Sequence, residues 1–83
     1  MWNIHPDVLV TDLGDELVLL HPPRSEMFSL NTAGRLIWRT LPGTVDSLAY
    51  ALEQAFDVTM LQAKADVQAV LGELSARDLA CQT

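Results

Sequence analysis

The sequence predicts an α+β fold in which a three-stranded antiparallel sheet is followed by three helices. Short runs rich in apolar and β-branched residues, separated by turn residues, occupy the first third of the chain. Apolar residues at helical spacing, each run preceded by Asn or Thr, occupy the rest. Because a thin sheet has one face that amphipathic helices can cover, this order favours a winged-helix-like arrangement.

The expected strands cover residues 8–11, 17–20 and 26–30. The second is an uninterrupted apolar run, which predicts a strand covered on both of its faces. Prolines in the segment 21–25 end it, because proline cannot donate a hydrogen bond to a β-ladder. Short connections favour an antiparallel meander, in which the strand 26–30 lies at the sheet edge.

The first two expected helices are bounded by clear local signals. Asn31 or Thr32 can cap the first, since a short side-chain oxygen accepts hydrogen bonds from free backbone N–H groups. Pro42-Gly43 ends that helix, and Thr44 can cap the second.

The third expected helix begins at Thr59, which forms a capping-box pattern with Gln62, and runs to about Ala76. Its apolar arc contains Met60, Ala63, Val67, Val70, Leu71 and Leu74. Small residues on the opposite side are expected to form a solvated face: Ala65, Ala69, Gly72 and Ala76.

Length and charge exclude several classes of protein. The 83 residues predict one domain, residues 1–83, with a thin hydrophobic core. Eleven acidic against five basic side chains give a net charge of −6. Binding to nucleic acid or to an anionic membrane needs clustered Lys and Arg, so both partners are disfavoured.

The chain shows no sign of export. Cys81 is the single cysteine, so no internal disulfide can form. No apolar run approaches the roughly 20 residues that span a bilayer, and no signal-peptide pattern is visible at the N-terminus. The sequence therefore predicts a cytoplasmic protein.

No catalytic or metal-binding constellation is recognisable, so we expect a protein that is not an enzyme and needs no cofactor. Cys81 falls in a tail expected to be frayed, with no adjacent His. His5 and His21 stand beside prolines and are expected to be solvated or locally hydrogen-bonded. Acidic residues around the first turn lack the spacing of a calcium loop and are expected only to aid solubility: Asp12, Asp15 and Glu16.

The strand 26–30 is the segment most suggestive of function. At a sheet edge it would carry Met27 and Phe28 on opposite faces, with only Glu26 and Ser29 to discourage pairing with other chains. Either a helix covers this edge, or the edge receives an extended peptide through backbone hydrogen bonds and side-chain pockets.

The segment 27–38, MFSLNTAGRLIW, resembles the signature of the PqqD-like family, the RiPP recognition elements of ribosomal peptide natural-product pathways. The family pattern is an aromatic, one residue, Leu-Asn, two residues, Gly, and then an apolar-Trp pair. The chain matches it at Phe28, Leu30, Asn31, Gly34, Ile37 and Trp38. The loop 22–25 departs from the family, because it is proline-rich where Gly is common.

The resemblance implies that a leader peptide adds as a further strand beside the strand 26–30 and lies against the third helix. Much of the signature is then structural: Leu30, Ile37 and Trp38 as core, Asn31 as a cap, and Gly34 where packing is close. The peptide-binding residues implied by this placement are Glu26, Met27, Phe28, Ser29, Ala63, Asp66, Val67, Val70, Glu73 and Arg77. The first-strand side of the sheet is a second candidate surface.

The resemblance further implies a stand-alone member that binds the leader region of a precursor peptide and presents it to a separate maturation enzyme. A lasso-peptide leader peptidase is the favoured partner. The alternative is a PQQ-type chaperone (PQQ synthesis protein D type) that delivers a precursor to a radical SAM enzyme. Outside the family, the alternatives are a winged-helix nucleic-acid binder, which the acidity disfavours, and a structural subunit whose strand edge is sealed by oligomerisation.

Overall fold

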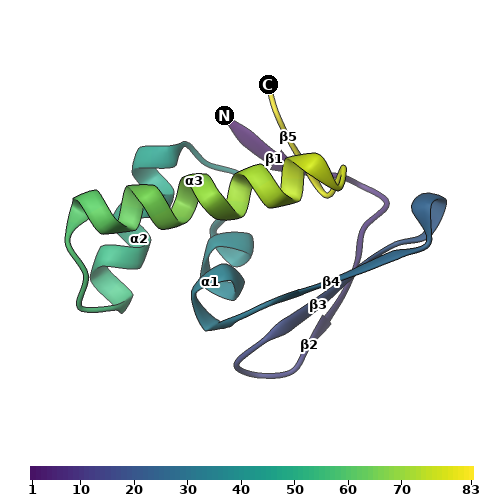
Figure 1. Ribbon diagram of the computed structural model, residues 1–83, viewed down its shortest axis with the longest axis horizontal. Coiled ribbons are helices and arrows are strands. Elements are labelled where there is room, and N and C mark those ends of the chain that lie inside the picture. The colour runs from purple at the N-terminus through teal and green to yellow at the C-terminus, as the bar shows by residue number, and fades with distance from the viewer.

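The computed structural model describes all 83 residues as a layer of helices on one side of a small sheet, with a separate two-stranded sheet formed by the two chain ends (Figure 1). The elements are β1 (Trp2–Ile4), β2 (Leu9–Asp12), β3 (Leu17–His21), the 3-10 turn η1 (Pro22–Arg24), β4 (Glu26–Leu30), α1 (Thr32–Thr40), α2 (Val45–Ala55), α3 (Met60–Ala76) and β5 (Ala80–Gln82). The predicted α+β fold, with a three-stranded antiparallel sheet followed by three helices, is confirmed. None of the helices is long and apolar enough to cross a lipid bilayer.

The sheet has the strand order β2-β3-β4, so β4 is an edge strand as predicted. Both strand pairs are antiparallel, and β3 lies between its two neighbours. β4 has the predicted range, whereas β2 is shifted by one residue, to Leu9–Asp12, and β3 is one residue longer because it includes His21.

Only one face of the sheet is covered by helices. Along β3, Leu17 and Leu19 are buried, whereas Val18 and Leu20, which alternate with them, are half-buried. The prediction that both faces of this strand are covered is therefore wrong. A short apolar run does not reveal how many of its faces meet a second layer, because the run looks the same in both cases.

The hydrophobic core lies between that face and the three helices. It combines residues of β3, β4, all three helices and the segment after α3: Leu17, Leu19, Leu30, Ile37, Trp38, Leu41, Leu48, Ala49, Leu52, Ala63, Val67, Leu71, Leu74, Leu79 and Ala80. The predicted core roles of Leu30, Ile37 and Trp38 are confirmed.

The helix caps agree with the sequence in part. The side chain of Asn31 accepts a hydrogen bond from the backbone N–H of Gly34, as the cap of α1. The full capping box belongs to α2. There the N–H of Thr44 donates to the hydroxyl of Ser47, and the N–H of Ser47 donates to the hydroxyl of Thr44. Thr59 accepts from the N–H of Gln62, but the side chain of Gln62 donates to Asp66 rather than back to the cap. The complete capping box predicted for α3 is therefore wrong.

The chain passes from β4 into α1 through Asn31 alone, and this junction is tightly packed. A Cβ atom on Gly34 would lie 3.0 Å from one side-chain carbon of Leu30 and 3.1 Å from another. Contacts this short are rare, so the expectation that Gly34 permits close packing is confirmed.

The two chain ends pair with each other, which the sequence did not indicate. Trp2, Asn3 and Ile4 of β1 face residues 80–82 of β5 in antiparallel register, and the termini lie side by side (Figure 1). Trp2 also exchanges two backbone hydrogen bonds with Gly43, which joins the β1–β5 sheet to the turn between α1 and α2. The expectation of a frayed tail around Cys81 is wrong.

The reversal after α3 depends on Asp78. This residue has a φ of 55°, in the left-handed region that Asp tolerates better than most residues. The turn brings Leu79 back under the helix, where its N–H donates to the carbonyl of Leu74 at 2.8 Å. Leu79 and Ala80 are thereby buried.

Asp12 connects the sheet to α1. Its carboxylate accepts two hydrogen bonds from Arg35 at 2.9 Å, one from Arg39 at 2.8 Å, and one from the N–H of Gly14 at 2.8 Å. The bond from Arg35 and then that from Gly14 lower the pKa of Asp12 from 3.8 to about 2. For Asp12, the expectation of a role in solubility alone is wrong.

Deleting residues 81–83 should lower the free energy of unfolding by about 1–3 kcal/mol, because β1 loses its partner strand and Ala80 becomes exposed. Urea unfolding followed by circular dichroism measures the loss. Gln82→Ala keeps the backbone pairing and is the control, with little change expected. Equal stability of the truncated and intact chains would mean that the pairing of β1 with β5 contributes nothing to the free energy of unfolding.

Asp12→Asn should destabilise the fold at neutral pH and much less in acid. A folded-state pKa of about 2, below the ordinary 3.8, gives stability that is present above pH 4 and is lost as the pH falls through 2. Urea midpoints of the two proteins should therefore differ at pH 7 and converge near pH 2. Asp57→Asn is the matched control, since the Asp57 side chain has no hydrogen bond or ion pair; a constant difference between wild type and Asp12→Asn at every pH would contradict the expectation.

Candidate functional site

The free edge of β4 presents its side chains to two sides. Met27 is 70% exposed and Ser29 is also exposed, both on the face without helices. Phe28 points the other way and packs against the core, and half-buried Glu26 forms an ion pair with Arg24 at 3.4 Å. The prediction that Met27 and Phe28 lie on opposite faces is confirmed.

The predicted residues of α3 divide into two groups. Ala63 and Val67 are fully buried, so they support the helix from below and have no surface to offer a ligand. The others lie at the surface at spacings of four, three and four residues, which places them on one flank of the helix. These residues, here called the α3 stripe, are Asp66, Val70, Glu73 and Arg77.

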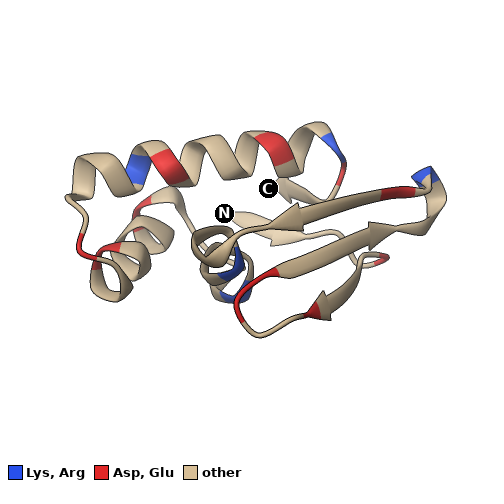
Figure 2. Cartoon of the chain, turned by 60° about the horizontal axis from the view of Figure 1, so that its bottom comes forward, with Lys and Arg blue, Asp and Glu red and all other residues tan.

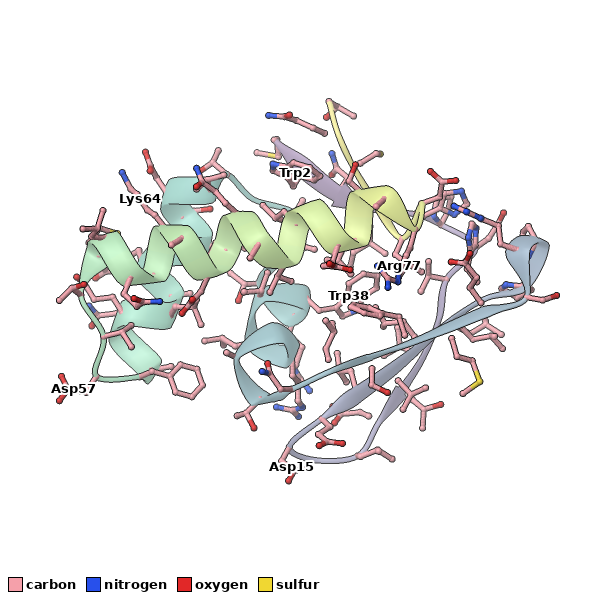
Figure 3. All side chains as sticks on the ribbon, in the orientation of Figure 1. Trp2, Asp15, Trp38, Asp57, Lys64 and Arg77 are labelled. Carbon is pink, nitrogen blue, oxygen red and sulfur yellow. The ribbon has the colours of Figure 1, made fainter.

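One contact ties the α3 stripe to β4. The guanidinium carbon of Arg77 lies 4.3 Å from the centroid of the Phe28 ring, and Arg77 also forms an ion pair with Glu73. Arg77 is labelled at the end of α3 that faces β4 in Figure 3. The stripe therefore contacts β4 at this end, whereas α1 lies between α3 and β4 farther along in Figure 1.

Two of the stripe's side chains differ in how much hydrogen-bonding capacity they retain. Asp66 accepts a single hydrogen bond, from the side chain of Gln62 at 2.9 Å. Its carboxylate keeps free lone pairs at a half-buried position. Arg77 is engaged by both Glu73 and Phe28. Asp66 and Val70 are thus the stripe's available polar and apolar groups.

The concave hollows of the structure lie elsewhere. One, of about 500 Å³, lies on the other flank of α3, where Gly72 and Ala76 adjoin Trp2 of β1. The predicted solvated face of small residues is confirmed as exposed, and part of it lines this hollow.

The second hollow, of about 450 Å³, lies between the β1–β5 sheet and the β3–β4 turn. His21 contributes to it but is only 3% exposed, and neither of its ring nitrogens has a hydrogen-bond partner. The ring of His5 packs edge-on against it, with centroids 4.6 Å apart. The expectation of a solvated or hydrogen-bonded His21 is wrong, whereas His5 does accept a local hydrogen bond from the N–H of Asp7.

Every Lys and Arg side chain is paired with a carboxylate. The pairs are Arg24 with Glu26 and Asp78, Arg35 and Arg39 with Asp12, Lys64 with Asp46, and Arg77 with Glu73. The basic side chains are spread over η1, α1, α3 and the C-cap of α3 rather than gathered in one cluster (Figure 2). A phosphate backbone would have to displace a carboxylate at each contact, which disfavours nucleic-acid binding.

The sequence match decides the family. The family model described as "Coenzyme PQQ synthesis protein D (PqqD)" matches residues 16–80, which is most of the chain. The chain belongs to the PqqD family. The match runs from β3 to the start of β5 and so includes both β4 and the α3 stripe of this PqqD-family chain.

Solved structures share the fold of this PqqD-family chain. One is described as TbiB1 in complex with the TbiA(β) leader peptide, with a TM-score of 0.89 and 24% identity over 98% of this chain and 96% of that one. Another is a lasso peptide synthetase B1 complexed with the leader peptide, with a TM-score of 0.85 and 23% identity over 98% of each chain. At these identities the likeness establishes the fold. No curated protein matches the sequence.

Proposed function

We propose that this PqqD-family domain binds the leader segment of a ribosomally made precursor peptide as an added strand on the free edge of β4. The observation that carries this proposal is that the unpaired edge of β4 lies beside the α3 stripe, where Arg77 contacts Phe28. The two solved structures described above are complexes with leader peptides, which supports the same ligand here.

Strand addition suits the chemistry of this edge. Alternate residues of β4 direct backbone N–H and C=O groups away from β3, and an extended peptide can satisfy them. Affinity would come from the backbone hydrogen bonds and from a few apolar anchors, since ordering a flexible leader costs entropy. The contacting residues proposed are Glu26, Met27, Phe28, Ser29, Asp66, Val70, Glu73 and Arg77, with Ala63 and Val67 as buried support.

Presentation to a separate enzyme is the second part of the proposal. The domain acts without catalysis, in the cytoplasm, by holding the core peptide at high effective concentration near an enzyme's active site. A lasso-peptide leader peptidase is the favoured enzyme, in keeping with the two structural neighbours. The alternative is delivery to a radical SAM enzyme in PQQ-type synthesis, which the description of the matching family favours.

Fluorescence anisotropy with labelled leader segments tests the ligand. The panel contains the TbiA(β) leader and leaders of PQQ-type and other lasso-type precursors. At least one should bind saturably below about 10 µM, equivalent to roughly −7 kcal/mol. A folded domain that binds none of them would lose its proposed ligand and leave the β4 edge to a structural role.

Val70→Glu tests the position of the peptide. A charge on the apolar member of the α3 stripe should weaken binding at least about tenfold, because it must be desolvated against the peptide. Gln68→Glu adds the same charge on the other flank of α3 and should leave affinity unchanged. If Val70→Glu is folded and binds like the wild type, the peptide does not lie against α3.

A further inference from the structure

The face of the sheet that no helix covers is uncharged and largely apolar. Two cross-strand rows form it in register. One row contains Leu9, Leu20 and Met27, and the other contains Thr11, Val18 and Ser29. Leu9 is 58% and Met27 70% exposed, and exposed apolar surface that continues across several strands usually marks a contact surface.

The apolar row is incomplete at its most exposed member. Leu20 has Leu9 on one side and Met27 on the other, whereas Met27 and Leu9, on the two edge strands β4 and β2, each have a cross-strand neighbour on only one side. A strand added to β4 would place one of its own side chains next to Met27. Directly paired residues in neighbouring strands share a face, and their Cβ atoms are about 4.5–5.5 Å apart.

We infer that Met27 is a specificity residue that selects an apolar side chain on the solvent-facing side of the bound peptide. This inference rests on the proposed strand addition and extends it. The peptide residue beside Phe28 points inward and contacts α3. The peptide residue beside Met27 points outward and extends the row Leu9–Leu20–Met27. The preferred ligand is thus a segment with adjacent apolar residues on both faces, rather than an amphipathic strand with a charged outer side.

The row has no group that could accommodate a charge. Its members are aliphatic or a thioether, and the parallel row offers only the hydroxyls of Thr11 and Ser29 and the apolar Val18. The ion pair of β4 is that of Glu26 with Arg24, and the Glu26 side chain lies on the opposite face with Phe28. A charged peptide residue beside Met27 would therefore lose hydration without gaining a partner.

Selection from a random dodecapeptide library displayed on phage tests the inference without a known ligand. The wild-type domain should enrich peptides with an apolar residue at an outward position. Met27→Lys should shift that one position toward Asp and Glu, since an opposite charge directly across the strands is favourable, and leave the inward positions unchanged. For a wild-type peptide with its outward residue changed to Glu, Met27→Lys should bind about three- to tenfold more tightly than the wild type does.

Leu9→Lys is the matched control, because Leu9 lies in the same row and is similarly exposed, but on the opposite edge strand β2, two strands away from β4. It should select the same peptides as the wild type. If Met27→Lys selects them too, while Val70→Glu still weakens their binding, strand addition holds and the role of Met27 is overturned. If the folded wild type selects no peptide, or sediments as a dimer whose β4 edges are paired, both the proposed function and this inference fail.

Discussion

The direct passage from β4 into α1 is the constraint on which the rest of the structure depends. Asn31 is the only residue between the two elements, and it caps the helix through the N–H of Gly34. Gly34 lies so close to Leu30 that a Cβ atom would not fit without displacement. With the helix tied to the end of the strand in this way, α1 can pack only on the inner face of the sheet.

This placement leaves one face of the three-stranded sheet covered by helices and the other face exposed. All three helices, together with Leu79 and Ala80, are committed to a single core on one face of a three-stranded sheet. A small domain has little apolar surface to bury, so no element remains to cover the outer face or the edge of β4. The β1–β5 sheet lies elsewhere, beside Gly43, where Trp2 is hydrogen-bonded to the backbone.

The surface left free has the features that an extended peptide needs. A strand edge offers backbone hydrogen bonds, and α3 runs close enough for Arg77 to lie over Phe28. Groups of three or more His, Cys, Asp or Glu that could hold a metal ion are absent. Binding and orientation are the properties that this arrangement supports.

Local sequence signals determined most of the elements. The strands of the meander, the caps Asn31, Thr44 and Thr59, and the buried arc of α3 follow from spacing and turn chemistry, which depend on near neighbours in the chain. The edge position of β4 and the opposite orientations of Met27 and Phe28 also follow, since side chains alternate along a strand.

Other features were decided only by the tertiary structure. The pairing of β1 with β5 joins segments at opposite ends of the chain, and strands of three residues carry too little periodicity to predict. Asp12 gained its role from Arg35 and Arg39, 23 and 27 residues away, and His21 its burial from contacts such as that with His5. The sequence by itself thus determined the three strands of the meander, the three helices and the edge position of β4. The tertiary structure decided which apolar residues are buried and which form an open row, because burial depends on what packs against a face.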